Sequence, residues 1–283
     1  MSSEADLSLL ARQWGASAVP FGLVNAQDWL ESPGAQKALT ALTQSAALRS
    51  VMLLSGPNGV GKSALVGRWM RSLDTRLFCP VCLTQATLSG TAILAALATK
   101  LGKEATFYRH ANLRLVEAAL QELERRILVV ILDEAQNYSQ PSLEELRLLL
   151  GLNLPEQPAF GLILIGDEYL LASLKLRNQR ALYSRLGYQV SLEPWTPAQS
   201  AQYLNNGLSA VGLSPAALEP AAVELLAQAS AGLPRSLCLL ARAAWIAAAT
   251  QRAQRISPAH VQQALQQVPW VPGLLPLTQP PPA

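Results

Sequence analysis

The chain has 283 residues, half of them hydrophobic, and a formal net charge of +3 at pH 7. This length fits one large domain or a domain with a smaller companion, and so mild a charge does not by itself mark a nucleic-acid-binding protein. No apolar run approaches the roughly 20 residues of a membrane span, and the start Met1-Ser2-Ser3-Glu4 has no signal-peptide character. We therefore expect a cytoplasmic protein with no membrane partner.

Predicted helices and strands alternate along the first two thirds of the chain. Apolar residues recur at helical spacing over 7–14 and 28–45. After these segments, short apolar runs predict strands and amphipathic stretches predict helices. In chain order these are strand 51–54, helix 64–72, strand 77–83, helices 91–101 and 113–125, strand 127–132, helix 142–150, strand 160–166 and strand 188–192. This alternation is typical of a mainly parallel α/β sheet.

The pattern changes after Pro194, where no strand-like run appears again. Four residues each precede a helical stretch, with proline at or near the first turn in several cases; they are Thr196, Ser214, Leu233 and Ser257. We expect an N-terminal helical segment (1–45), an α/β domain (46–194), a compact domain of about four helices (195–268) and a proline-rich tail (269–283). The tail is either a frayed terminus or an extended docking segment.

A glycine-rich loop separates the first strand from its helix. It reads Gly56-Pro57-Asn58-Gly59-Val60-Gly61-Lys62-Ser63 and fits the G-x-x-x-x-G-K-[ST] pattern at every fixed position. Small residues let backbone N–H groups turn inward around a phosphate chain, and the helix that Ala64 opens would point its N-terminus at it. Lys62 would reach the β- and γ-phosphates, and the Ser63 hydroxyl would bind Mg²⁺. The loop thus predicts ATP and Mg²⁺ as cofactors, against a chance match in a glycine-containing loop.

The strand 127–132 ends in two adjacent carboxylates, Asp133 and Glu134. Six apolar residues in a row are typical of a strand buried on both faces of a parallel sheet. Carboxylates at its end are costly unless they serve a cation or a reaction. We predict that Asp133 holds Mg²⁺ and that Glu134 orients and polarises the attacking water. The alternative is an Asp-Glu pair that caps a helix.

Two further local patterns have modest interpretations. Cys79-Pro80-Val81-Cys82 is a lone C-x-x-C on a predicted strand, so we favour thiols packed in the core over a zinc or redox site. The sequence Ser142-Leu143-Glu144-Glu145 resembles a capping box at the start of helix 142–150.

The order of these motifs resembles the AAA+ ATPases, with an α/β fold that has a five-stranded parallel sheet, helices on both faces and a small all-helical lid. Over roughly residues 20–268 it is similar to the ExeA-type ATPases within them. That likeness is carried by Leu132-Asp133-Glu134-Ala135-Gln136-Asn137, Leu164-Ile165-Gly166, Ser184-Arg185-Leu186, Leu192-Glu193-Pro194 and Gly232-Leu233-Pro234-Arg235. The resemblance implies ATP hydrolysis.

The same resemblance assigns three further residues. Arg185 matches the family arginine that reaches the γ-phosphate of a neighbouring subunit, with Arg180 as the alternative, so the resemblance implies rings or filaments. Arg235 matches the second sensor arginine of the lid. Asp167 occupies the first sensor position, where the family often has a neutral polar residue, and this departure weakens its match.

Two branches of this family are relevant. Short members resemble the transposition regulators of the TniB, TnsC and MuB kind, which bind duplex DNA as ATP-dependent oligomers and direct a transposase. We expect this function, with double-stranded DNA contacted without sequence specificity by Lys100, Lys103, Thr106 and Arg109. The alternative is a protein-remodelling or secretion-assembly ATPase without DNA binding, and a signalling P-loop ATPase remains a further possibility.

Overall fold

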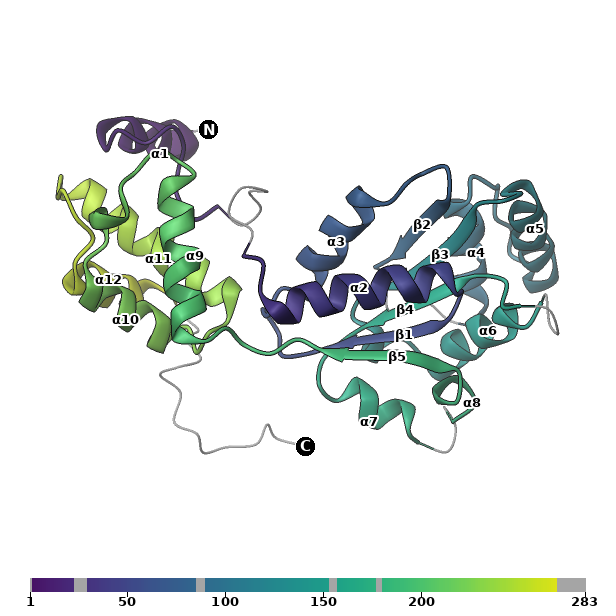
Figure 1. Cartoon of the computed structure of the whole chain (residues 1–283). Coiled ribbons are helices and arrows are strands. Elements are labelled where there is room, and N and C mark those ends of the chain that lie inside the picture. The colour runs from purple at the N-terminus through teal and green to yellow at the C-terminus, as the bar shows by residue number, and fades with distance from the viewer. Residues whose placement is uncertain (1, 23–29, 85–89, 153–156, 177–179, 269–283) are drawn as a thin grey trace. The chain divides into compact units, whose positions relative to one another are not determined.

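The structure is a computed structural model that describes residues 2–22, 30–84, 90–152, 157–176 and 180–268. The chain divides into two compact units (Figure 1). The α/β unit comprises Pro33–Asn58 and Lys62–Leu192, and the helical unit comprises Met1–Ser32, Gly59–Gly61 and Glu193–Ala283. The predicted N-terminal segment 1–45 is therefore divided between the units, because its first helix packs with the later helices and its second helix packs on the sheet.

The α/β unit contains one sheet of five parallel strands in the order β2-β3-β4-β1-β5. Its strands are β1 (Val51–Ser55), β2 (Phe78–Leu83), β3 (Ile127–Leu132), β4 (Gly161–Ile165) and β5 (Leu186–Ser191). Every residue of β1 and β4 is buried, as is all of β3 except its first residue. The prediction of apolar strands covered on both faces is thus confirmed, as is the predicted α/β fold.

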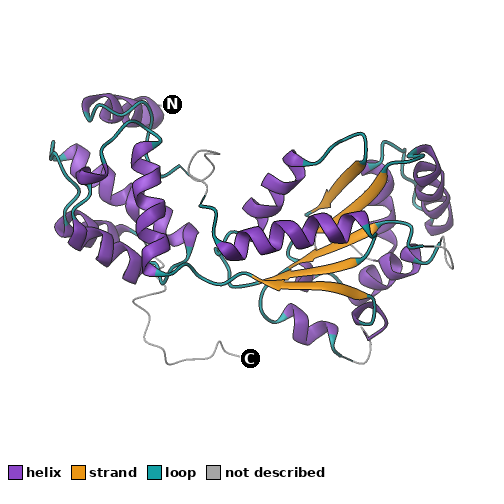
Figure 2. Ribbon diagram, viewed as in Figure 1, coloured by secondary structure: helices purple, strands orange, loops and turns teal. Residues whose placement is uncertain are grey.

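Helices cover both faces of this sheet (Figure 2). They are α2 (Pro33–Ala47), α3 (Lys62–Ser72), α4 (Gly90–Lys100), α5 (Arg109–Glu122), α6 (Gln140–Leu150), α7 (Leu170–Leu174) and α8 (Arg180–Tyr183). Helices α2 and α3 lie on one face, and α4 and α6 lie on the other with α5 packed against α4. This two-sided cover leaves the edge where the parallel strands end as the place for a ligand.

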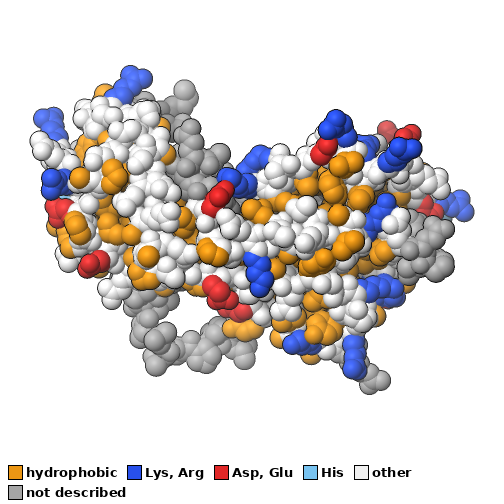
Figure 3. All heavy atoms as spheres, in the orientation of Figure 1, with side chains coloured by type: hydrophobic (Ala, Val, Ile, Leu, Met, Phe, Trp, Pro, Cys, Tyr) orange, Lys and Arg blue, Asp and Glu red, His pale blue; other side chains and the backbone are white. Residues whose placement is uncertain are grey.

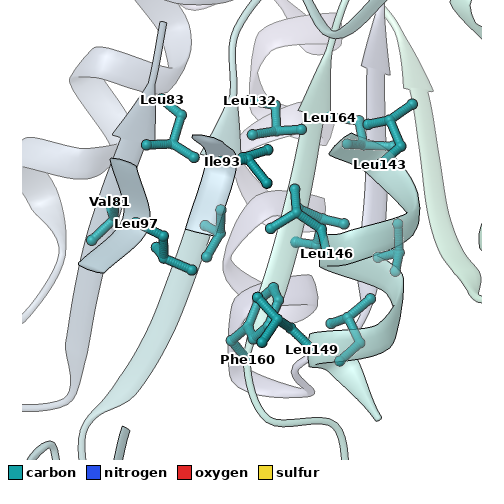
Figure 4. Packing of buried hydrophobic residues seen from close by; sticks show 14 of the residues in the cluster. Val81, Leu83, Ile93, Leu97, Leu132, Leu143, Leu146, Leu149, Phe160 and Leu164 are labelled. Atoms are coloured by element: carbon teal, nitrogen blue, oxygen red, sulfur yellow. The ribbon is translucent and has the colours of Figure 1, made fainter. Parts of the chain in front are cut away.

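The core of the α/β unit lies between the sheet and the face formed by α4 and α6 (Figure 4). Ile93 and Leu97 of α4 and Leu146 of α6 are fully buried against β3 and β4. Their spacing of three and four residues along each helix creates the apolar stripe that the sheet covers. A rigid base of this kind fixes the positions of the loops at the strand ends.

The helical unit has its own core, which no strand interrupts among the described residues 193–268. Its elements are α1 (Ser2–Gln13), α9 (Pro197–Ser209), the 3₁₀ turn η3 (Pro215–Ala217), α10 (Pro220–Ala229), α11 (Pro234–Thr250) and α12 (Pro258–Gln267). The ring of Trp14 packs edge-on against the buried ring of Trp245 of α11, with 6.3 Å between centroids. The N-terminal helix thus belongs to the core of this unit.

Several predicted helix starts are wrong. Helix α1 begins at Ser2 and not at residue 7, and α5 begins at Arg109 and not at residue 113. Two further errors concern capping residues. Helix α6 begins at Gln140, because the hydroxyl of Ser139, not that of Ser142, caps it by accepting the N–H of Ser142 at 3.3 Å. Ser214 opens only the short turn η3, and the next helix starts at Pro220. In both cases a second capping residue or proline nearby competes with the one chosen from the sequence.

Other expectations concern segments outside the described residues. The proline-rich tail 269–283 is one of them, and so is Asp28 at the start of the predicted helical spacing. Among the residues that the structure describes, no helix combines the length and apolar character that crossing a membrane requires.

Candidate nucleotide-binding site

The glycine-rich loop connects β1 to α3 at the carboxyl edge of the sheet. Gly59 and Gly61 have φ angles of +87° and +104°, a backbone conformation that side chains strongly disfavour. Helix α3 begins at Lys62, so its free N–H groups and the positive end of its dipole open onto the loop. Ala64 lies in that first turn with its side chain exposed. The loop therefore has the backbone geometry that cradles phosphate groups.

Lys62 is the buried cation of this site, with only 7% of its surface exposed. Its Nζ donates to two carbonyl oxygens of the loop, that of Gly56 at 2.7 Å and that of Pro57 at 3.2 Å. A buried ammonium group is costly unless a negative partner joins it. The loop thus holds a cation ready for a polyphosphate, and its residues fit that ligand.

Burial lowers the pKa of Lys62 below its ordinary value, and four carboxylates oppose the shift. In order of effect these are Glu134, Asp167, Asp133 and Glu168. Asp133 and Glu134 follow β3, and the other two follow β4, so the acidic groups gather where these neighbouring strands end. Glu168 was not among the residues predicted from the sequence, because a single glutamate after a strand carries no pattern.

Ser63 and Asp133 come together although 70 residues separate them in the chain. The Ser63 hydroxyl donates to Asp133 Oδ1 at 3.3 Å, and the same oxygen accepts the N–H of Glu134 at 3.0 Å. Hydroxyl and carboxylate oxygens are hard ligands that suit Mg²⁺. These two side chains, which were predicted as a pair, lie in position to share one cation.

Glu134 has an unusual backbone conformation at the end of β3, with φ 52° and ψ 47°. Its exposed carboxylate accepts a hydrogen bond from Nε2 of Gln136 at 2.7 Å. Gln136 was not predicted as a site residue, since a polar residue four positions past a strand gives no signal without its contacts. The following residues are anchored by Tyr138, whose hydroxyl donates to the carbonyl of Leu83 at 2.8 Å. Burial, with smaller effects of Cys82 and Asp133, raises the pKa of Tyr138 to about 12.

Asp167 is engaged locally after β4. Its Oδ1 accepts the backbone N–H groups of Tyr169 at 3.0 Å and Leu170 at 3.1 Å, which fixes the start of α7. The carboxylate still contributes to the charge around Lys62. The residue at the predicted sensor position thus has a structural role as well, and its sensor role stays a prediction.

The arginines expected to contact phosphates differ in their contacts. The backbone N–H of Arg235 donates to the carbonyl of Gly59 in the loop at 3.1 Å. Arg185 precedes β5, and its Nη1 donates to the carbonyl of Arg147 in α6 at 2.8 Å. The alternative, Arg180, is exposed as the first residue of α8. Arg235 is exposed in the first turn of α11, in the helical unit. Their roles stay predictions.

Two predicted DNA-contacting cations are paired within the chain. Lys103 Nζ donates to Glu122 Oε2 at 2.7 Å, and Arg109 makes two hydrogen bonds of 2.7 and 2.8 Å to Glu145. The bond to Glu145 raises the pKa of Arg109. Each pair is locally neutral, so neither cation offers its full charge to a phosphate backbone.

The other two residues that were predicted to contact DNA are Thr106 and Lys100. Thr106 donates its backbone N–H to Asn112 Oδ1 at 2.8 Å and accepts from Asn112 Nδ2 at 2.8 Å, so it fixes the loop before α5. Lys100 is exposed at the end of α4. On the face drawn in Figure 3, lysine and arginine side chains of the α/β unit are dispersed among neutral atoms. This face lacks the continuous basic stripe of a duplex-binding surface.

Cys79 and Cys82 lie on β2, where residues three apart point to opposite faces of the sheet. Burial raises the pKa of the Cys82 thiol, as does Asp133, while Lys100 opposes them. Among the described residues, no group of three metal-type side chains is found. The pair is typical of thiols packed in the structure.

Residues 46–174 match the family model of the AAA domain, and this stretch contains both the glycine-rich loop and the strand that ends in Asp133. The general secretion pathway protein A of Aeromonas hydrophila is 26% identical over 223 residues. These residues make up 77% of this chain and 40% of that protein, so the chain spans well under half the length of this curated relative.

Solved structures resemble the chain in fold. Cdc6p from Pyrobaculum aerophilum matches with a TM-score of 0.68 and 19% identity, over 91% of this chain and 71% of that one. The ORC2 protein of Aeropyrum pernix matches with a TM-score of 0.67 and 17% identity, over 87% and 70%. At these identities the likeness establishes the fold alone.

Proposed function

We propose that the chain is an ATP-hydrolysing AAA module that acts on a protein partner in secretion assembly, rather than on DNA. The observation that carries the ATPase proposal is the convergence of Lys62, Ser63, Asp133 and Glu134 at the ends of β1 and β3. These are a phosphate-binding cation, two cation ligands and a base for water. The similarity to a secretion pathway protein supports the choice of partner.

Each residue has a distinct task in this proposal. The loop and Lys62 bind and orient the phosphates, while Ser63 and Asp133 hold Mg²⁺, which supplies charge neutralisation on the phosphate oxygens. Glu134 orients the attacking water and accepts its proton.

We also propose that the site is completed by a second copy of the chain. Arg185 is held by the carbonyl of Arg147 within its own α/β unit, on α6 and not on the phosphate loop. A neighbouring subunit could release it to meet the γ-phosphate of the next site, where positive charge stabilises the transition state. ATP binding would then favour assembly, and hydrolysis would favour disassembly.

The sequence-based prediction of a transposition regulator makes duplex DNA the alternative partner. The ion pairs of Lys103 and Arg109 argue against this role. The test is binding of a fluorescent DNA duplex by the purified protein with ATP, a non-hydrolysable ATP analogue, ADP or no nucleotide, at low and high salt. We expect no binding in any state while ATP hydrolysis is intact. Nucleotide-dependent binding that weakens steeply with salt would contradict the proposal and support the DNA function.

A further inference from the structure

The turn after β3 brings the side chain of Gln136 back to the carboxylate of Glu134. The left-handed conformation of Glu134 reverses the chain into the short helix η2 (Ala135–Asn137). As a result, Gln136 Nε2 lies 2.7 Å from Glu134 Oε2. A carboxylate oxygen can only accept here, so the amide nitrogen must face it and donate. A strained non-glycine residue of this kind persists only where the surrounding structure holds it.

The other end of the Gln136 amide is fixed against β4. Its Oε1 is buried and has no hydrogen-bond partner. A Cβ on Gly166, the residue after β4, would lie 2.6 Å from this oxygen, so the amide lies close against the end of β4. An unpaired buried acceptor lowers stability, because it gives up its hydrogen bond to water. The amide is therefore wedged between the ends of two strands at a cost in stability.

The carboxylate that Gln136 holds belongs to the residue that follows Asp133. Asp133 Oδ1 accepts both the Glu134 N–H at 3.0 Å and the Ser63 hydroxyl at 3.3 Å. The bond from Gln136 thus restrains the Glu134 side chain next to the two candidate cation ligands. Without it, the exposed glutamate side chain would be free to sample rotamers directed into solvent.

We propose that Gln136 is a positioning residue that holds Glu134 ready for water activation, a role that rests on the proposed ATPase function. It acts through Glu134 and touches neither phosphate nor water itself. Small misplacements of a catalytic group cost large factors in rate, so one hydrogen bond to the base has a measurable effect.

The first test is Gln136→Met, which keeps the length of the side chain and removes both polar atoms. We expect kcat for ATP hydrolysis to fall about 10- to 100-fold, with the KM for ATP unchanged. Gln121→Met, an exposed change on α5, is the control and should alter nothing. A lowered melting temperature with normal kcat would show a purely structural role and overturn the proposal.

The second test asks whether Gln136 acts through Glu134. In a Glu134→Gln background, Gln136→Met should lower the residual rate no further. A further loss of the same size as in the wild-type protein would overturn the proposal, since Gln136 would then act independently of the base.

The third test does not depend on activity and separates this proposal from the proposed function. Melting temperatures of the nucleotide-free proteins Q136M, E134A and the double variant should be non-additive, because both single changes break the same hydrogen bond. Additive shifts would overturn the contact and the inference with it. A wild-type protein that hydrolyses no ATP would overturn the proposed function instead.

Discussion

Lys62 is a residue whose burial makes sense only with a ligand. Its ammonium group is almost fully enclosed and is satisfied by two loop carbonyls, which are weak partners for a full charge. The phosphate-binding loop around this lysine was predictable from the sequence, because the loop, the strand before it and the helix after it all carry local signals. Asp167 was placed at the site by resemblance alone, and the carboxylate of Glu168 was not predicted there, since only the order of the strands brings them near Lys62.

Replacing Lys62 by alanine should therefore weaken ATP binding while the fold is kept. A hydrogen bond to a charged group contributes about 1.5–3 kcal/mol, so we expect a loss of about 10- to 100-fold in affinity. Titration with a fluorescent ATP analogue measures it. Lys37→Ala, at an exposed position on α2, is the matched control, and equal affinities for the two variants would refute the role of Lys62.

Two glycines of the helical unit differ in one respect that can be tested. Gly232 (φ +71°) and Gly212 (φ +81°) both have left-handed backbones, but a Cβ on Gly232 would meet the carbonyl oxygen of Trp195 at 2.1 Å. The carbonyl of Gly232 also accepts the N–H of Trp195 at 2.8 Å. This close approach holds the segment before α9 against the residues before α11.

Alanine substitutions at the two positions separate the cost of a strained backbone from the cost of a steric clash. Gly212→Ala should cost about 1–2 kcal/mol, the price of a left-handed backbone alone. Gly232→Ala should cost about 3 kcal/mol or more, because the backbone of Trp195 must also move. Urea unfolding followed by circular dichroism measures both, and equal losses would show that the approach to Trp195 is unimportant.

At the scale of elements, the strands were the most predictable part of the chain. The strand predicted at 127–132 has the bounds of β3, because six consecutive apolar residues leave no other state that buries them. Helix starts were less predictable: Ser139 caps α6 in place of Ser142, since capping depends on which serine reaches a free N–H group. The order of the strands in the sheet was not predicted, because the local sequence pattern does not specify which strands pair.

Helix α6 supports the edge of the sheet from which Asp133 and Glu134 project, so its buried face is expected to carry stability. Leu146 is fully buried and Leu148 is 46% exposed on the same helix. Leu146→Ala should cost about 2–5 kcal/mol of unfolding free energy, and Leu148→Ala less than about 0.5 kcal/mol. Chemical unfolding of both variants checks the difference, and similar costs would contradict the packing described for α6.

At the scale of the whole molecule, the proposed ATPase needs one copy of the chain to complete the site of another copy. Arg185→Ala should then keep ATP affinity and lower hydrolysis by at least about 1,000-fold, the lower end of the range for such arginines. The sequence indicated this residue by resemblance, but its contact with the Arg147 carbonyl could not be foreseen from local pattern.

Mixing two inactive variants tests this directly. Lys62→Ala lacks the phosphate cation but keeps Arg185, whereas Arg185→Ala keeps an intact phosphate loop. An equal mixture should recover part of the wild-type ATPase rate, because some interfaces would combine an intact loop with an intact arginine. A mixture that stays inactive although the two variants co-assemble would rule out action between subunits.

The most direct test of the central claim is the rate of Mg²⁺-dependent ATP hydrolysis by the wild-type chain and by Glu134→Gln, with Glu104→Gln at an exposed loop position as the control. We predict hydrolysis that EDTA abolishes and Mg²⁺ restores, a loss of at least about 100-fold in the Glu134 variant with ATP binding retained, and no change in the control. A Glu134→Gln protein that hydrolyses ATP at the wild-type rate would contradict the account.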